Sequence, residues 1–152
     1  MALANLTQEE TNRKNHEHCK RIAEEIEEYT NGNVYRCAEC GEIINNEKSS
    51  YDDETEMYHL SCGCETPYEP EQLGLYDYFA DCLDIEYRVS GRGADALNSV
   101  CIMVTCGGPN IYVDTESRNV ELYWGGDYAS YPLLAGTINA IEEWATELWG
   151  CM

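Results

Sequence analysis

Positively charged residues are scarce in this sequence. Nine lysines and arginines stand against 29 aspartates and glutamates among 152 residues, so the formal net charge at pH 7 is −20. Phosphate contacts supply most of the affinity of proteins for DNA and RNA, so a chain this acidic is not expected to bind nucleic acid directly. The expected partners are instead proteins with basic surfaces, of which nucleic-acid-binding enzymes have the most extensive.

Long apolar runs are also missing. No run approaches the roughly 20 residues that a membrane-spanning helix needs, and nothing resembles a signal peptide. We therefore expect a cytoplasmic protein with no membrane partner.

Phenylalanine occurs once, whereas there are 12 tyrosines and 3 tryptophans, so amphipathic aromatic side chains must do much of the packing.

The nine cysteines do not indicate a secreted disulfide protein. Their number is odd, four of them have metal-ligand spacing, and no export signal accompanies them. Cys101 and Cys106 lie at an odd separation in one expected strand, so their side chains point to opposite faces and cannot pair. Five cysteines are expected to be small, reduced core residues: Cys19, Cys82, Cys101, Cys106 and Cys151.

Two half-sites with metal-ligand spacing organise residues 34–64. Cys37 and Cys40 form a Cys-x2-Cys pair, and His59 and Cys62 form a His-x2-Cys pair 18 residues further on. Zinc prefers thiolate sulfur and imidazole nitrogen, and a Cys-x2-Cys pair presents two thiolates from one tight turn. The second pair is expected on one face of a short helical turn. The sequence therefore predicts a tetrahedral Zn²⁺ site.

The fourth ligand of this site has two candidates. Cys64 follows Cys62 after a single glycine, so its thiolate could take the place of the His59 imidazole. A catalytic zinc normally keeps one position open, so four protein ligands indicate a structural ion. The segment resembles one finger of the LIM and treble-clef class over about 30 residues. It lacks a second finger, so the tandem partner-binding arrangement of LIM domains is not implied.

The remaining patterns predict an α+β fold in three parts. Residues 1–33 are expected to hold an N-terminal helix over 7–30, which begins with the capping-box residues Thr7 and Glu10. Residues 34–64 form the zinc module. Residues 65–152 are expected to hold an acidic helix over 71–84, an antiparallel four-stranded sheet, and a C-terminal helix that starts at 130–132 and packs on the sheet. The four strands are expected at 85–90, 99–106, 110–115 and 119–124.

The acidic residues suggest a partner-binding surface. Asp77, Asp81 and Asp84 recur at i, i+4 and i+7, so they would line one edge of the helix about 6 Å apart. A row of carboxylates at that spacing could imitate a nucleic-acid backbone; the alternative is an ordinary solvated helix face. The proposed surface also includes acids of the zinc-module loop and the turn after it: Asp52, Asp53, Glu54, Glu56, Glu69 and Glu71.

Enzymatic chemistry is not favoured. The Gly107-Gly108 turn is followed by neither the lysine nor the helix of a phosphate-binding loop. A zinc deaminase needs His-x-Glu before its Cys-x-x-Cys pair, and this order is absent here. With three histidines in the chain, no nucleophile–base pair stands out. The sequence predicts a protein that is not an enzyme.

Two functional hypotheses remain. In size and acidity the chain resembles phage-encoded anti-CRISPR and antirestriction proteins, and the stretches 106–115 and 120–124 resemble small phage and mobile-element proteins. The resemblance implies a DNA-mimicking inhibitor that works in a bacterial host cell, binds the basic surface of a CRISPR effector or restriction enzyme, and blocks DNA binding or cleavage. The alternative is a zinc-stabilised adaptor that joins proteins without mimicking nucleic acid.

Overall fold

The computed structural model describes residues 7–45 and 49–152, which form two compact units. The larger unit joins Met1–Ile26 to Phe79–Met152, and the smaller unit is Glu27–Tyr78. The predicted boundaries at 33/34 and 64/65 differ from these divisions. None of the helices in the described part of the chain combines the length and the apolar character needed to span a bilayer.

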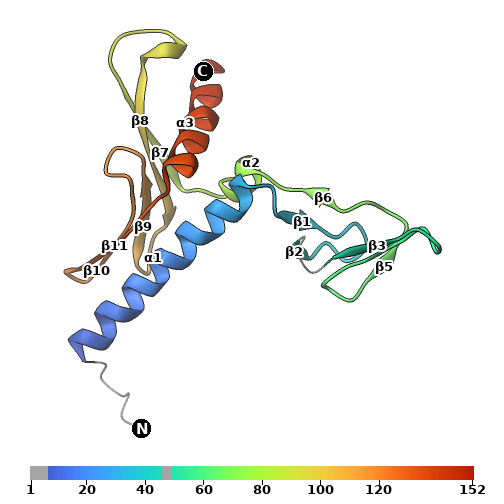
Figure 1. The fold of residues 1–152 in the computed structure, drawn as a ribbon. Helices are drawn as coiled ribbons and strands as arrows, with labels where there is room; N and C mark the ends of the chain where they lie inside the picture. The colour runs from blue at the N-terminus through green and yellow to red at the C-terminus, as the bar shows by residue number, and fades with distance from the viewer. Residues whose placement is uncertain (1–6, 46–48) are drawn as a thin grey trace. The chain divides into compact units, whose positions relative to one another are not determined.

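An antiparallel five-stranded sheet forms the centre of the larger unit (Figure 1). Its strands follow one another as neighbours, in the order β11-β10-β9-β8-β7, because short turns connect them. The four predicted strands are present with small shifts of their ends. The prediction of a four-stranded sheet is nevertheless wrong, since a fifth strand adds to its edge. The strands are β7 (Asp84–Val89), β8 (Leu97–Thr105), β9 (Asn110–Asp114), β10 (Asn119–Trp124) and β11 (Asp127–Pro132).

The fifth strand occupies the region where the C-terminal helix was predicted to start. Gly125 and Gly126 both have positive φ angles, 55° and 90°, and they form a two-residue turn that pairs Trp124 with Asp127. Such turns favour hairpins because their backbone twist matches that of the strands. Pro132 ends the new strand at the sheet edge, where proline is tolerated. The helix α3 (Ala135–Gly150) begins only afterwards.

Two helices cover one face of the sheet (Figure 1). The helix α1 (Gln8–Thr30) begins with the predicted capping box, in which the Glu10 N–H donates to Thr7 Oγ1 at 3.2 Å and the Thr7 N–H donates to Glu10 Oε2 at 3.0 Å. Alternate strand residues face α1 and α3, as the pleat requires. The buried core therefore combines both helices with the sheet; its members include Cys19, Ile22, Ile26, Val100, Ile102, Ile111, Val113, Val120, Leu122, Ile138 and Ile141.

The five cysteines outside the metal-ligand motif were predicted to be core residues, and this prediction is only partly right. Cys19 is fully buried, and Cys82 and Cys101 are half-buried. Cys106 and Cys151 are exposed, because the first lies in the turn after β8 and the second follows the end of α3. All five are free thiols in the structure.

The predicted acidic helix over 71–84 does not form. In its place are β6 (Glu71–Gln72), the four-residue helix α2 (Leu75–Tyr78), a turn, and the start of β7 at Asp84. Leu73 is buried in the smaller unit and donates its N–H to the Val34 carbonyl at 2.9 Å. Phe79 is buried in the larger unit, where its ring packs on Trp144 with centroids 4.9 Å apart. These two anchors belong to different units, so a single helical stripe cannot serve both.

The smaller unit contains two three-stranded antiparallel sheets. One has the order β2-β1-β6 and the other has the order β3-β4-β5. All of these strands have only two or three residues, so the backbone pairing of the unit is sparse. Besides β6, they are β1 (Val34–Arg36), β2 (Ile43–Asn45), β3 (Ser50–Asp52), β4 (Met57–His59) and β5 (Glu65–Thr66).

Candidate metal centre

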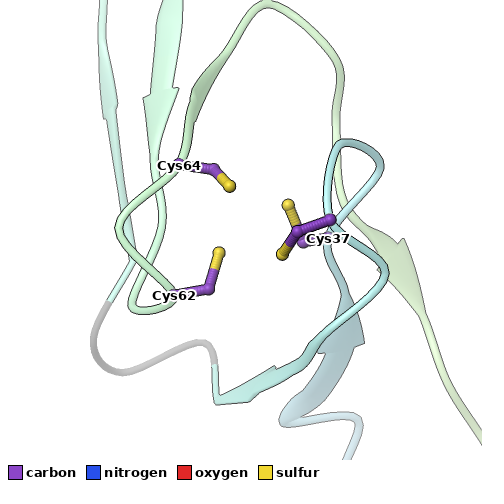
Figure 2. Close-up of side chains that lie close together, drawn as sticks. Cys37, Cys62 and Cys64 are labelled. Atoms are coloured by element: carbon purple, nitrogen blue, oxygen red, sulfur yellow. The ribbon is translucent and has the colours of Figure 1, made fainter.

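Four cysteine side chains converge in the smaller unit. The sulfur atoms of Cys37, Cys40, Cys62 and Cys64 all lie within 4.8 Å of one another. Figure 2 shows the sulfurs of Cys62 and Cys64 directed toward that of Cys37. Their arrangement suits a single metal ion surrounded by thiolates.

The first two sulfurs come from the turn between β1 and β2. The Gly41 N–H donates to the Cys37 carbonyl at 3.0 Å, and the Cys37 N–H donates to the Glu42 carbonyl at 2.9 Å. Gly41 has a φ of 75°, a left-handed conformation that glycine adopts without steric cost. The turn thus holds Cys37 and Cys40 on one side of the backbone, as the Cys-x2-Cys spacing predicts.

The other two sulfurs come from the turn between β4 and β5. The Leu60 N–H donates to the Cys64 carbonyl at 3.0 Å, and the Gly63 N–H donates to the Leu60 carbonyl at 2.9 Å. Gly63 has a φ of 93°, so it lets the chain reverse between Cys62 and Cys64. A short helical turn was predicted here, and the structure has a strand and a tight turn instead.

His59 is not among the residues whose ligand atoms converge. It is the last residue of β4, and strand alternation sends it to the side opposite Leu60, which is buried. Its Nδ1 lies 3.3 Å from Glu65 Oε1, and its Nε2 lies 4.0 Å from Asp52 Oδ2. The fourth converging ligand atom therefore comes from Cys64, the alternative candidate, and not from His59.

The packing around the cysteines is slight. The buried cluster consists of Cys37, Ile44 and Leu60, and the half-buried Tyr35 and Tyr58 pack against it together with Cys62 and Cys64. A cluster this small buries too little apolar surface to offset the conformational entropy of the segment, which is why small modules commonly depend on a metal. A metal bond between the two turns would supply the missing constraint.

A hydrogen bond that the sequence did not predict also links the two half-sites. Thr66, which is fully buried at the end of β5, donates from Oγ1 to Glu39 Oε1 at 3.0 Å. Glu39 lies between Cys37 and Cys40 in the first turn, whereas Thr66 closely follows Cys64. The contact therefore positions the first pair of cysteines relative to the second pair.

Without a metal, the thiols of Cys37 and Cys64 have unequal proton affinities. Backbone N–H donation from Cys40 lowers the pKa of Cys37 to about 7, and donation from Glu39 contributes in the same direction. The side-chain hydrogen bond with Cys62 raises the pKa of Cys64 to about 12. A metal ion would displace the remaining protons, because only thiolates act as strong ligands. Metal binding at this site is accordingly expected to release protons.

The geometry fits a tetrahedral thiolate complex. Zn–S bonds of about 2.3 Å place the sulfurs of a regular tetrahedron about 3.8 Å apart. The observed limit of 4.8 Å requires only a small contraction of the two turns toward the ion. Sulfur-only ligand sets favour soft or borderline metals such as zinc and exclude Mg²⁺ and Ca²⁺, which prefer oxygen. A zinc ion held by all four sulfurs would have no open position.

The acidic residues proposed as a binding surface do not form one row. Asp81 and Asp84 belong to the larger unit, and the others belong to the smaller one. Asp77 caps the short α2, where its Oδ2 accepts the Gly74 N–H at 2.8 Å. Glu71 lies 3.6 Å from the Arg36 guanidinium. Apart from Asp77, the proposed residues lie exposed or half-exposed on loops and strands: Asp52, Asp53, Glu54, Glu56, Glu69, Glu71, Asp81 and Asp84.

Four of these acids do remain together. Asp52 ends β3, and Asp53, Glu54 and Glu56 form the exposed turn before β4. Hydrogen bonding by the Glu54 backbone N–H, at 2.9 Å from Asp52 Oδ1, lowers the pKa of Asp52. The Asp52 carboxylate therefore keeps its negative charge well below neutral pH.

Comparison with protein-family models, with curated proteins and with solved structures found no match for this chain.

Proposed function

We propose that the four cysteines hold a structural Zn²⁺ that keeps the smaller unit folded. The support for this proposal is the convergence of four sulfurs from two glycine-containing turns around a very small apolar cluster. The ion would be bound by Cys37, Cys40, Cys62 and Cys64, and it would act by joining the two turns. Closed zinc sites with four cysteine ligands are structural rather than catalytic.

We further propose that the zinc-stabilised unit presents an acidic surface to a basic, nucleic-acid-binding protein. The observation that carries this proposal is the uneven division of charge. Residues 27–78 hold 13 acidic and 2 basic residues, a net charge of −11, although they are about a third of the chain. Four thiolates and one Zn²⁺ would add a further −2. Such a surface favours fast, salt-dependent association with basic partners.

The partner proposed for this surface is a CRISPR effector or a restriction enzyme, whose access to DNA the chain would block. Bound on the basic cleft, the acidic unit would compete with DNA by occupying the positions of its phosphates. Because the predicted helix over 71–84 does not form, the proposed contact is the exposed turn at Asp53, Glu54 and Glu56. No reaction is required of the chain in this role.

The test is a DNA-cleavage assay with purified effectors at low and at moderate salt, with the zinc-loaded full chain. The informative variant replaces Asp53, Glu54 and Glu56 by their amides. The control variant makes the same change at Glu9 and Glu17 on α1 and at Glu143 on α3, all of them exposed. The proposal expects inhibition that weakens at the higher salt and is lost in the first variant only. Full cleavage by every effector tested, or equal effects of both variants, would contradict it.

A second candidate function is a zinc-stabilised adaptor. Three tyrosines of the smaller unit expose about half of their surface or more: Tyr51 at 49%, Tyr68 at 63% and Tyr76 at 54%. Tyrosine is enriched at protein interfaces because it combines a large apolar ring with a polar hydroxyl. For an adaptor, replacement of these tyrosines would abolish partner binding, and removal of the acidic turn would leave it nearly unchanged.

A further inference from the structure

The face of the five-stranded sheet opposite α1 and α3 carries a shallow groove of about 460 Å³. Within residues 7–45 and 49–152 no helix of the larger unit covers this face (Figure 1). Its lining is polar and aromatic, in contrast to the aliphatic face that the helices bury. The residues that line the groove are Arg88, Cys101, Asn110, Tyr112, Asp114, Glu121 and Tyr123.

Three tyrosines form a connected row beside and within the groove. Tyr112, Tyr123 and Tyr128 lie on the neighbouring strands β9, β10 and β11. The ring centroids are 5.9 Å apart for the first pair and 5.1 Å apart for the second. The Tyr123 hydroxyl donates to Glu121 Oε2 at 2.7 Å, and this hydrogen bond raises the pKa of Tyr123. The phenol therefore stays neutral, and the ring, which is 43% exposed, carries a negative π face.

The charged groups of this face already show how it holds a guanidinium. Arg88 donates from its two terminal nitrogens to both oxygens of Asp114, at 3.0 and 3.2 Å. It also donates to Glu116 at 2.7 Å and to Glu86 at 3.0 Å. The single positive charge is thus shared among three carboxylates. Together with Glu121, these groups carry four negative charges and one positive charge, so a net charge of −3 remains on the face.

We propose that the groove binds an arginine side chain of a basic partner protein. A guanidinium can stack on the tyrosine rings and donate in plane to the carboxylates, as a compact ammonium group cannot. The net negative charge argues against anionic ligands, and the polar lining argues against an apolar one. The inference goes beyond the function proposed above, because the groove lies in the larger unit and does not depend on the metal.

The test uses the zinc-loaded full chain and two defined peptides, hexa-arginine and hexa-lysine, at physiological ionic strength. Calorimetry gives the affinities, and amide chemical-shift changes give the place of binding. We expect hexa-arginine to bind at least about fivefold more tightly than hexa-lysine, with shifts centred on β9 and β10. Equal affinities, or shifts confined to residues 27–78, would overturn the proposal.

Four variants separate binding in this groove from general attraction to an acidic chain. Glu121→Gln and Tyr123→Leu should each weaken hexa-arginine binding about tenfold, whereas Tyr123→Phe keeps the ring and should retain it. Glu143→Gln removes one charge from an exposed position of α3 and is expected to change the affinity less than about twofold. Equal losses in Glu121→Gln and Glu143→Gln would contradict the proposal. Should Tyr123→Leu fail to fold, the two glutamate variants decide by themselves.

Discussion

Replacing Cys64 by serine should damage metal binding far more than replacing His59 by alanine. Cys64 contributes one of the four converging sulfurs, whereas His59 contacts carboxylates and is not part of the cluster. Structural zinc contributes about 10–16 kcal/mol of apparent binding free energy in small zinc modules at neutral pH. One ligand of four therefore accounts for about 2.5–4 kcal/mol, and the zinc affinity should fall about 70- to 900-fold in the Cys64→Ser variant.

The assay is a zinc competition titration of the full chain against a chromophoric chelator, with metal content measured directly. His59→Ala should keep one zinc per chain with an affinity within about tenfold of the original, at or below the lower end of the roughly 10- to 100-fold loss seen for residues that hydrogen-bond metal ligands, because the His59 ring lies against Glu65 and Asp52. Cys62→Ser serves as the positive control, because Cys62 belongs to both candidate ligand sets. A large loss in His59→Ala together with a normal affinity in Cys64→Ser would refute the assignment of the fourth ligand.

Three further predictions concern other parts of the molecule. Arg88→Met leaves Asp114, which is 9% exposed, without its guanidinium, so the larger unit should lose about 2 kcal/mol of stability. Thermal denaturation should show a Tm about 10 °C lower, and an unchanged Tm would contradict this. Gly63→Ala forces a side chain into a φ of 93°, so zinc affinity should fall about tenfold, and an unaltered chelator titration would show that the turn tolerates the change. Burial raises the pKa of Cys19 to about 11, so at a pH of about 8 only about a thousandth of this thiol is ionised. Alkylation followed by mass spectrometry should therefore label the exposed Cys106 before Cys19, and comparable labelling of both would refute this.

The metal centre was largely predictable because ligand spacing is a local property of the sequence. The pair at Cys37 and Cys40 needs only one tight turn, and a glycine supplies it. The choice between His59 and Cys64 was not local, since it depends on which side of β4 faces the buried cluster. That face is set by the pairing of β4 with β3 and β5, which the sequence did not reveal.

Most helices and strands of the larger unit were predictable for a similar reason. The helices α1 and α3 and the strands β7 to β10 show regular apolar periodicity, which a single sequence displays directly. The strand β11 is harder, because Pro132 shortly after a serine is also typical of a helix start. The region around Asp77 misleads for another reason. Its helical spacing is genuine, but Leu73 and Phe79 are anchored in different units, and this competition is visible only in three dimensions.

We propose that a metal ion at the four cysteines holds the smaller unit together, and hydrogen exchange of the full chain with and without a strong chelator measures this dependence. After metal loss, the amides of Cys37, Leu60 and Leu73, which are hydrogen-bonded in the smaller unit, should lose their protection. The amides of β8 to β10 should keep theirs, because their core does not include the site. Unchanged protection throughout residues 34–73 after verified removal of the metal would contradict the account.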